Sequence, residues 1–392
     1  MKYTLQAVTA CLVGALASVA SAVELSKWET LVPGEEEEAK NSANELINQM
    51  KNDYVSKGKR VFRDAHPRGI GCVAAKFVVD PNLASQYRTG VFSEPGKSYD
   101  AIIRFSSSLG PVGDNQKDAR GMAIKVLGVA GKKLMADQPD ATSHDFLQIN
   151  TPTFPTKNAH DFAGIVSLKT DPKNIVKFLL ESPIVHALEL KALLEATQNN
   201  PQAGRSLLAT QFFSQVPYLF KSSSLTSPVK FTSRPCTAVS TQYLDGSEGE
   251  LRNDLQTRLQ QKDACFEFAY QFYKEGQGFD VENGMSLWQE NKAPFVKFAT
   301  ITIPKQTFLT DEKLHYCDNL SFQPWHAVDS HRPIGNLNRT RKIVYEMISK
   351  FRHDQNQEAR NFAEPTDLSA WNSLNSSTFS TWNSVTIPAG SK

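Results

Sequence analysis

The chain has 392 residues, of which 40% are hydrophobic and 21% are charged, and its formal net charge at pH 7 is +2. This near-neutral balance, without an interleaved basic and aromatic stripe, argues against a dedicated nucleic-acid-binding protein. The length is enough for one large domain or two ordinary ones, whose core does not depend on disulfides.

The first residues have the pattern of a secretory signal peptide. Lys2 supplies a short positive region, residues 5–19 are mostly apolar or small, and residues 20–22 (Ala-Ser-Ala) match a small-x-small cleavage site. The apolar stretch is too short and too rich in Gly, Ser and Thr for a permanent membrane anchor. We therefore expect residues 1–22 to be removed and the mature protein to be periplasmic or secreted.

Four cysteines remain after this cleavage. None of them lies in a C-x-x-C or C-x-x-C-H arrangement, which excludes a metal finger and covalent cofactor attachment. In an exported protein they could form disulfides, and the sequence leaves the pairing open. They are Cys72, Cys236, Cys265 and Cys317.

The N-terminal half predicts a helix followed by strands. Residues 35–54 form an amphipathic helical pattern that begins with four glutamates, as the helix dipole favours, so residues 23–57 are interpreted as a helical arm. Segments rich in β-branched and aromatic residues then predict four strands. These strands are expected at residues 72–79, 99–106, 121–127 and 144–149.

A helical pattern runs from residue 158 to about residue 198, with Pro172 and Pro183 as breaks. After a late helix, the residues beyond Phe362 are rich in Ser, Asn and Thr, so residues 363–392 are expected to be a flexible tail. The order of elements predicts an α+β fold for residues 58–362, a closed antiparallel eight-stranded barrel with helices outside. The second group of strands is expected at residues 229–232, 265–272, 296–303 and 319–323.

The late helix, residues 341–353, carries the most informative side chains. It contains no Gly or Pro, and its apolar positions recur at helical spacing. At about 100° per residue, Tyr345 lies about 40° around the helix from Arg341, and Arg352 about 20° from Arg341. A nearby cation favours the charged form of a phenol, and a phenolate can ligate haem iron. From this stripe alone, an ordinary helix with a packed tyrosine and solvated arginines remains the alternative.

Short polar motifs flank the first four predicted strands. The common signatures of hydrolases and nucleotide enzymes, G-x-S-x-G, H-E-x-x-H and the Walker loop, are absent from the sequence. Each polar motif alone has an ordinary explanation as a turn or a strand end. The motifs are Arg63-Asp-Ala-His66, Arg104-Phe-Ser106, Asp118-Ala-Arg120-Gly121 and Asn150-Thr-Pro152.

Together with the R-x-x-x-Y of residues 341–345 and the arginine seven residues after the tyrosine, these motifs resemble the haem catalases. That family carries R-x-x-H, R-F-S, D-x-R-G and N-T-P around its first four barrel strands, in the same order. Residues 294–304 are also similar to the strand that precedes the family's late helix. The resemblance covers roughly residues 59–353, and it implies a catalase-like barrel with haem b between the barrel and the late helix.

The resemblance implies roles for the matching residues. Tyr345 is expected to ligate the iron, with Arg341 holding it as a phenolate. His66 is expected to be the distal base, which moves a peroxide proton from one oxygen to the other. Asn150 would orient the peroxide, and Ser106 would fix the imidazole through its second ring nitrogen. Breaking an O–O bond heterolytically needs such a base and an electron-rich axial ligand.

Four more residues are expected to contact the cofactor. Arg63, Arg104 and Arg352 match family positions that pair with the haem propionates. Phe154 lies in the segment after N-T-P, where the family commonly has two phenylalanines, although here it is followed by Pro155.

Two further departures bear on the substrate. Ala65 stands where a valine usually narrows access to the iron, and Met122 stands where phenylalanine is usual after D-x-R-G. The chain is also short, which makes it most similar to the abbreviated catalase-related haem proteins, and a bound nicotinamide cofactor is not expected. A more open pocket would admit larger peroxides or organic reductants.

The leading hypothesis is an exported haem b enzyme that decomposes hydrogen peroxide or uses it to oxidise small organic donors. A fatty-acid hydroperoxide isomerase or dehydratase is one alternative, and a non-catalytic haem-binding barrel is another. The expected partners are a peroxide and a small organic reductant, without nucleic acid or a membrane span, and a homo-oligomer is possible.

Overall fold

The computed structural model describes residues 25–108, 117–198, 200, 205–237, 249–358 and 364–374. The expected signal peptide lies outside these described residues, so the structure does not bear on it.

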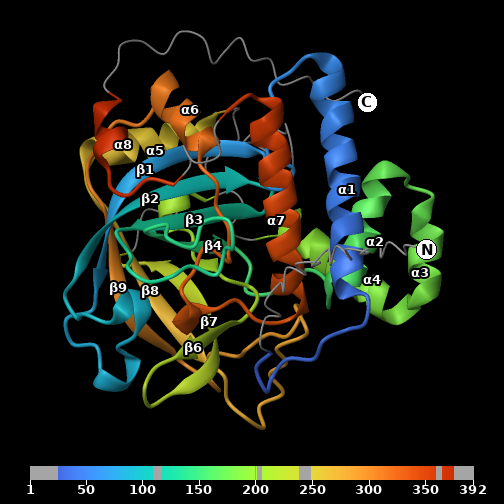
Figure 1. Cartoon of the computed structure of the whole chain (residues 1–392), viewed down its shortest axis with the longest axis horizontal. Helices are drawn as coiled ribbons and strands as arrows, with labels where there is room; N and C mark the ends of the chain where they lie inside the picture. The colour runs from blue at the N-terminus through green and yellow to red at the C-terminus, as the bar shows by residue number, and fades with distance from the viewer. Residues whose placement is uncertain are drawn as a thin grey trace, which may run out of the picture.

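A closed antiparallel barrel forms the centre of the molecule (Figure 1). Its strands are β1 Arg68–Val79, β2 Ser98–Ser107, β3 Arg120–Leu127, β4 Ser143–Ile149, β5 Phe212–Phe213, β6 Tyr218–Lys221, β7 Thr226–Pro235, β8 Ala264–Phe272 and β9 Phe295–Ile303. Eight of them close the ring in the order β1-β2-β3-β4-β5-β7-β8-β9, because β5 pairs with both β4 and β7. The remaining strand, β6, pairs with β7. The predicted α+β fold with an eight-stranded barrel is therefore confirmed.

Aromatic rings fill the barrel. Phe77, Phe146, Phe231 and Phe268 are each at most 1% exposed. The ring centroids of Phe146 and Phe268 lie 4.8 Å apart, and those of Phe77 and Phe268 lie 5.3 Å apart. Full burial of one such side chain stabilises the fold by about 1.5–3 kcal/mol, so the inward-facing positions of the strands dominate the core.

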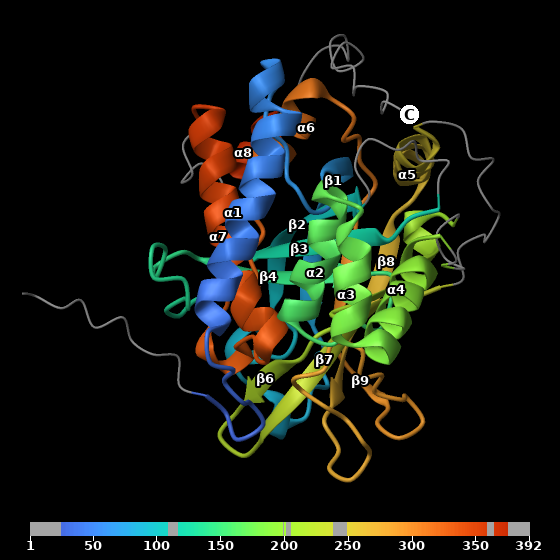
Figure 2. The ribbon, with the colours of Figure 1, turned by 90° about the vertical axis from the view of Figure 1, so that its right-hand side faces the viewer.

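The helices pack outside the barrel. They are α1 Glu35–Asp53, α2 Ala159–Thr170, α3 Asn174–Glu181, α4 Pro183–Thr197, α5 Glu250–Gln261, α6 Asp311–Asn319, α7 Asn336–Gln355 and α8 Ser369–Ser373. The first helix lies alongside α7, and α2 to α4 form a separate group beside the barrel (Figures 1 and 2). Pro183 begins α4 at the position where its missing N–H costs nothing, and the Asn158 side chain caps α2. The predicted breaks in the helical insert are confirmed.

The strand predicted at residues 319–323 is wrong. Asn319 ends α6, and residues 320–323 have no strand partner. Instead of pairing with a strand, the backbone carbonyl of Leu320 accepts hydrogen bonds from Arg63 and Arg352. The true eighth strand of the ring is β5, whose two residues are too few to show a period.

The expectation of a flexible tail does not hold for residues 364–374. Glu364 forms an ion pair of 3.1 Å with Lys125, whose side chain is fully buried on β3. Trp371 of α8 is 2% exposed and packs against Tyr316 at a ring distance of 5.9 Å. The ion pair with the buried Lys125 and the burial of Trp371 hold residues 364–374 in place, although this segment is polar in composition.

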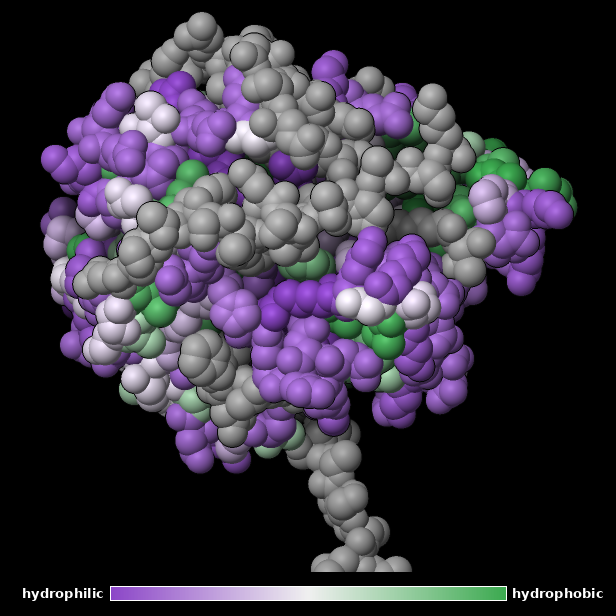
Figure 3. Space-filling model, turned by 90° about the horizontal axis from the view of Figure 1, so that it is seen from above, coloured by the Kyte–Doolittle hydropathy of each residue, from purple (hydrophilic) through white to green (hydrophobic). Residues whose placement is uncertain are grey.

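The upper face of the molecule is largely hydrophilic, and apolar residues gather at the edge where the helical insert lies (Figure 3). On α3 and α4 the exposed apolar side chains are Val176, Leu180, Ile184, Leu188 and Leu194. None of the helices in the described part of the chain has the length and apolarity needed to cross a bilayer.

The four cysteines of the described residues are paired. Cys72 of β1 is bonded to Cys317 of α6, which is 245 residues away in sequence. Cys236 is bonded to Cys265 of β8, with a separation of 29 residues. The first bond therefore fixes the end of α6 to the barrel. The second joins the residue after β7 to the neighbouring strand β8.

The long-range disulfide is expected to stabilise the fold more than the short one. Loop-closure entropy grows with the logarithm of loop length, so Cys72→Ala/Cys317→Ala should lose about 2 kcal/mol more than Cys236→Ala/Cys265→Ala. Urea unfolding of the two double variants measures this difference. Equal losses would contradict the expectation.

Candidate functional site

The strand register brings the four polar motifs to one end of the barrel. Gly69, Ser106, Gly121 and Ile149 lie opposite one another on β1, β2, β3 and β4. The motif that precedes β1 and the motif that follows β4 are each within a few residues of this row. Side chains from four separate segments of the sequence therefore converge.

His66 lies at the centre of this group. Its Nδ1 is 3.2 Å from the Ser106 hydroxyl oxygen, and Arg104 donates a hydrogen bond of 2.9 Å to its backbone carbonyl. His66 has a φ of 53°, in the left-handed region, and the following Pro67 makes that conformation harder to adopt. Such a backbone costs about 1–3 kcal/mol, so the contacts with β2 are needed to hold the imidazole in place.

Gly121 makes room for this imidazole. A Cβ atom at this position would lie 2.7 Å from the Ser106 hydroxyl oxygen and 2.8 Å from the His66 Nδ1. Any side chain would therefore push the two groups apart, and the glycine of the D-x-R-G motif is explained by this close approach.

The imidazole is neutral over a wide pH range. Burial lowers the pKa of His66 to about 3, and the guanidinium of Arg104 contributes. Arg341 of α7 also contributes, so the late helix is close enough for its charge to act on the imidazole. A neutral ring can accept a proton, which an imidazolium cannot.

Asn150 presents a free amide donor. Its side-chain oxygen accepts a hydrogen bond of 2.8 Å from the Arg120 N–H, which fixes the orientation of the amide. Asn150 is 2% exposed, and its Nδ2 has no hydrogen-bond partner among the described residues. A buried donor without a partner is costly, so this amide is suited to a bound ligand.

The predicted stripe on α7 is present. Arg341 donates to the Tyr345 hydroxyl at 3.4 Å and to the Asn338 side chain at 3.0 Å. Burial opposes the charge, but the phenolic oxygens of Tyr345 and Tyr218 outweigh it and raise the pKa of Arg341. Tyr345 is only half-buried, which does not support the alternative of an ordinary core tyrosine. Tyr218, on β6, was not identified from the sequence, since no motif surrounds it.

Three arginines predicted as ligands of the propionates meet around one carboxylate. Arg63 lies 3.6 Å from Asp318, and Arg352 donates to the backbone carbonyl of Asp318. Burial lowers the pKa of Arg104 to about 9, and Arg63 adds repulsion. Burial also lowers the pKa of Arg352, and again Arg63 repels it. Asp318, which the sequence did not reveal, compensates only part of this charge.

Phe154 belongs to a small apolar cluster. It packs against Ala159, Val216 and Leu337, with its ring 5.2 Å from that of Phe162. Its observed contacts join the loop after β4 to the first turn of α7, and none of them tests the predicted contact with a cofactor.

The residues present fit haem. The arginine cluster offers charge for two carboxylates, and the Nε of Arg104 is buried without a hydrogen-bond partner in the described structure. The Asn150 amide is a second unused donor, and the Arg341–Tyr345 pair supplies a phenol next to a cation. A dianionic cofactor whose metal accepts a phenolate satisfies the arginine cluster and the phenol, and the Asn150 amide is left for a second ligand.

Comparisons with known proteins agree with this geometry. The family model for catalase matches residues 46–184. Catalase C of Rhizobium meliloti (strain 1021) is 31% identical over 113 residues, which are 28% of this chain and 14% of that protein. Over residues 46–184 the chain is similar to the haem catalases.

Solved catalases share the fold of this chain. The structure of a fungal catalase aligns with a TM-score of 0.62 and 14% identity, over 82% of this chain and 65% of that one. Catalase A from Saccharomyces cerevisiae aligns with a TM-score of 0.61 and 16% identity, over 82% of this chain and 67% of that one. The family match includes the motifs from Arg63 to Asn150 and ends before α7.

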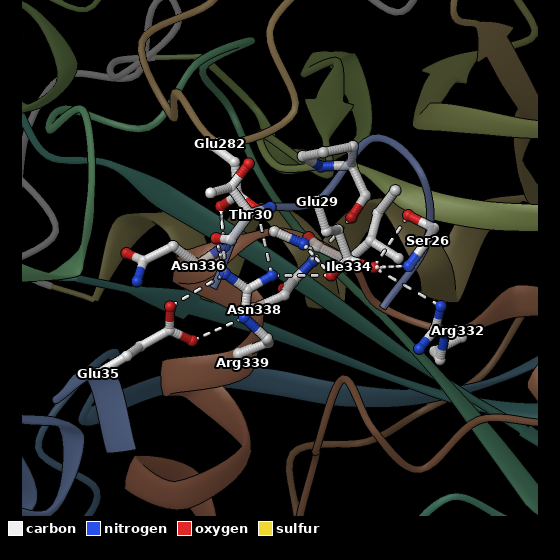
Figure 4. A network of polar contacts seen from close by, with 12 residues as sticks. Ser26, Glu29, Thr30, Glu35, Glu282, Arg332, Ile334, Asn336, Asn338 and Arg339 are labelled. Atoms are coloured by element: carbon white, nitrogen blue, oxygen red, sulfur yellow. Dashed lines mark hydrogen bonds and ion pairs between the residues drawn. The ribbon is translucent and has the colours of Figure 1, made fainter. Parts of the chain in front are cut away.

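The first turn of α7 is held by a polar network that includes the N-terminal segment (Figure 4). Arg339 pairs with Glu29 at 2.8 Å, with Glu35 at 2.6 Å and with Glu282 at 3.2 Å. Although burial opposes it, the carboxylates of Glu35 and Glu282 raise the pKa of Arg339. Glu282 also accepts the backbone N–H of Asn336 at 2.6 Å, where the helix dipole favours an anion. The network thus positions the helix that carries Arg341 and Tyr345.

Removal of the central cation of this network should be costly. Arg339→Met would leave carboxylates buried without their partner, so we expect a loss of about 3–5 kcal/mol in the free energy of unfolding. Lys350→Met, on the same helix, removes a solvent-exposed pair with Asp354 and should cost at most about 1 kcal/mol. Urea unfolding compares the two variants, and similar losses would argue against the network.

His66 should make the protein less stable in acid. Between pH 6.5, its ordinary pKa, and about pH 3, the unfolded chain binds a proton that the folded imidazole does not. The free energy of unfolding therefore falls as the pH falls through this window. His66→Gln cannot titrate, so its pH dependence should be shallower by up to about 1.4 kcal/mol per pH unit. Urea unfolding at pH 7 and pH 5 measures both slopes, and identical slopes would refute a depressed pKa.

Proposed function

We propose that the protein is a haem b enzyme that decomposes hydrogen peroxide or uses it to oxidise small organic donors. The observation that carries the proposal is the neutral imidazole of His66, which Ser106 fixes and which lies within electrostatic range of Arg341 on the helix of Tyr345. A passive carrier of haem has no need for a positioned base. The catalase family match over residues 46–184 and the catalase-like fold support a peroxide-related oxidoreductase.

Two groups of the chain's own residues would hold the cofactor. Tyr345 would ligate the iron, and Arg341 would favour the phenolate over the phenol. Arg63, Arg104 and Arg352 would pair with the propionates, which would compensate the positive charge around Asp318. When bound, haem supplies the redox-active iron at which a peroxide O–O bond is broken.

The distal residues would handle the peroxide. With Nδ1 next to the Ser106 hydroxyl, the Nε2 of His66 is the free ring nitrogen, and it would take a proton from one peroxide oxygen and return it to the other. The unused Nδ2–H of Asn150 would donate to the peroxide and orient it. Proton transfer of this kind is worth about 10²–10⁴-fold in rate.

We also propose that the protein is exported. The leader-like pattern of residues 1–22 supports export, and so does the pairing of Cys72, Cys236, Cys265 and Cys317 into two disulfides, which persist in oxidising compartments.

Larger peroxides are a second candidate substrate class. Ala65, which directly precedes the distal imidazole, is solvent-exposed and small. A short, exposed side chain at this position favours access for a bulky group, so a fatty-acid hydroperoxide isomerase or dehydratase is the second candidate function.

Haem reconstitution tests the proposal. Full-length protein incubated with haemin should bind one equivalent and show a Soret band, which Tyr345→Phe should weaken or shift because the ligand is removed. Tyr273→Phe, a half-buried tyrosine that packs against Trp288, is the matched control and should leave the band unchanged. His66→Ala should keep the band and lower kcat/KM for peroxide by about 10²–10⁴-fold.

An oxygen electrode separates the candidate activities. Oxygen release from hydrogen peroxide indicates a catalase, and peroxide consumption only with an added organic donor indicates a peroxidase. Consumption of a fatty-acid hydroperoxide without oxygen release or donor indicates the isomerase or dehydratase. Stoichiometric haem binding without any peroxide turnover would indicate a non-catalytic haem-binding barrel in place of an enzyme. Failure to bind haem would refute the proposal.

A further inference from the structure

A second group of ligand-type side chains is buried in the helical insert, between α2 and α4. Asp161 is 7% exposed, His186 is 3% exposed and Glu189 is fully buried. One oxygen or nitrogen atom from each lies within 4.8 Å of the others. Neither the catalase motifs nor the proposed reaction uses these residues.

The hydrogen bonding of His186 leaves one ring nitrogen available. Its Nδ1 contacts the backbone carbonyl of Phe178, which can only accept, so Nδ1 carries the hydrogen. The imidazole also stacks on the Phe178 ring at 3.9 Å, which fixes its plane. Nε2 then faces the Asp161 carboxylate at 3.4 Å. Metal-binding histidines typically donate their second N–H to a backbone carbonyl in this way.

The two carboxylates leave negative charge uncompensated. One oxygen of Glu189 accepts the backbone N–H of Lys157 at 2.7 Å, and the other has no hydrogen-bond partner among the described residues. Even a protonated His186 would balance only one of the two carboxylates. Burial of an uncompensated carboxylate is strongly unfavourable, and one divalent cation beside a neutral imidazole removes the excess charge.

We propose that Asp161, His186 and Glu189 bind one divalent transition-metal ion. One imidazole nitrogen and two carboxylate oxygens suit Zn²⁺ or Mn²⁺ better than Mg²⁺ or Ca²⁺, which prefer oxygen ligands alone. The ion joins α2 to α4 and leaves at least one coordination position for water. Because Glu189 also holds the backbone of Lys157, the ion stabilises the loop that connects Asn150 to α2.

A shared proton is the rival explanation for the same cluster. Burial raises the pKa of Glu189 to about 7, and the adjacent Asp161 adds to this effect. A protonated Glu189 could then donate to Asp161, and no metal would be needed.

Metal titration of the full-length, haem-loaded protein distinguishes a bound metal ion from a shared proton. After treatment with a chelator, Zn²⁺ or Mn²⁺ is titrated by calorimetry, and bound metal is counted by mass spectrometry separately from the haem iron. We expect one equivalent and a rise in Tm of about 5 °C at saturation. The isosteric variants Glu189→Gln and Asp161→Asn should lower the affinity at least 10-fold while the Soret band is unchanged.

His160→Ala is the matched control, since this exposed histidine of α2 contacts the carboxylates of Glu38 and Glu181 at the surface. It should bind the metal as the unmodified protein does. Absence of stoichiometric binding in the unmodified protein would overturn the proposal in favour of the shared proton. Binding that survives both isosteric variants, or that is lost in His160→Ala, would also overturn it.

Discussion

The arrangement of the site depends on the burial of three guanidinium groups around a single carboxylate. Arg63 precedes β1, Arg104 lies on β2 and Arg352 lies near the end of α7, and all three surround Asp318 at the end of α6. Desolvated like charges repel, and one aspartate compensates only part of them. The fold therefore places excess positive charge at one end of the barrel, which an anionic ligand can balance. The disulfide between Cys72 and Cys317 keeps α6 in position against this repulsion.

The late helix is fixed at both ends and carries its reactive side chains between them. At its N-terminus Arg339 pairs with carboxylates from the N-terminal segment and from Glu282. Near its C-terminus Arg352 donates to the backbone carbonyls of Asp318, in the last turn of α6, and of Leu320, which follows α6. These anchors come from distant parts of the sequence. The position of Tyr345 relative to His66 is therefore a property of the whole tertiary structure, since neither α7 nor the barrel determines it alone.

The sequence could predict the parts of the site that lie on strands adjacent both in sequence and in the barrel. Ser106 and Gly121 lie on neighbouring strands that follow one another in sequence, so the motifs carry their spatial order with them. Asp318 and Tyr218 could not be found in this way, because their roles arise only when α6 and β6 meet residues from elsewhere. Residues 319–323 were predicted as a strand from composition, which cannot show that arginines would bind their backbone oxygens.

The same cations that attract an anion also affect the distal base. Arg104 and Arg341 help to keep the pKa of His66 low, so an anionic group bound beside them would weaken their effect and raise that pKa. Burial is nevertheless the largest cause of the shift, and a ligand that fills the space excludes more water. The low pKa keeps the imidazole neutral near pH 7, so a base beside Arg104 and Arg341 is compatible with proton transfer.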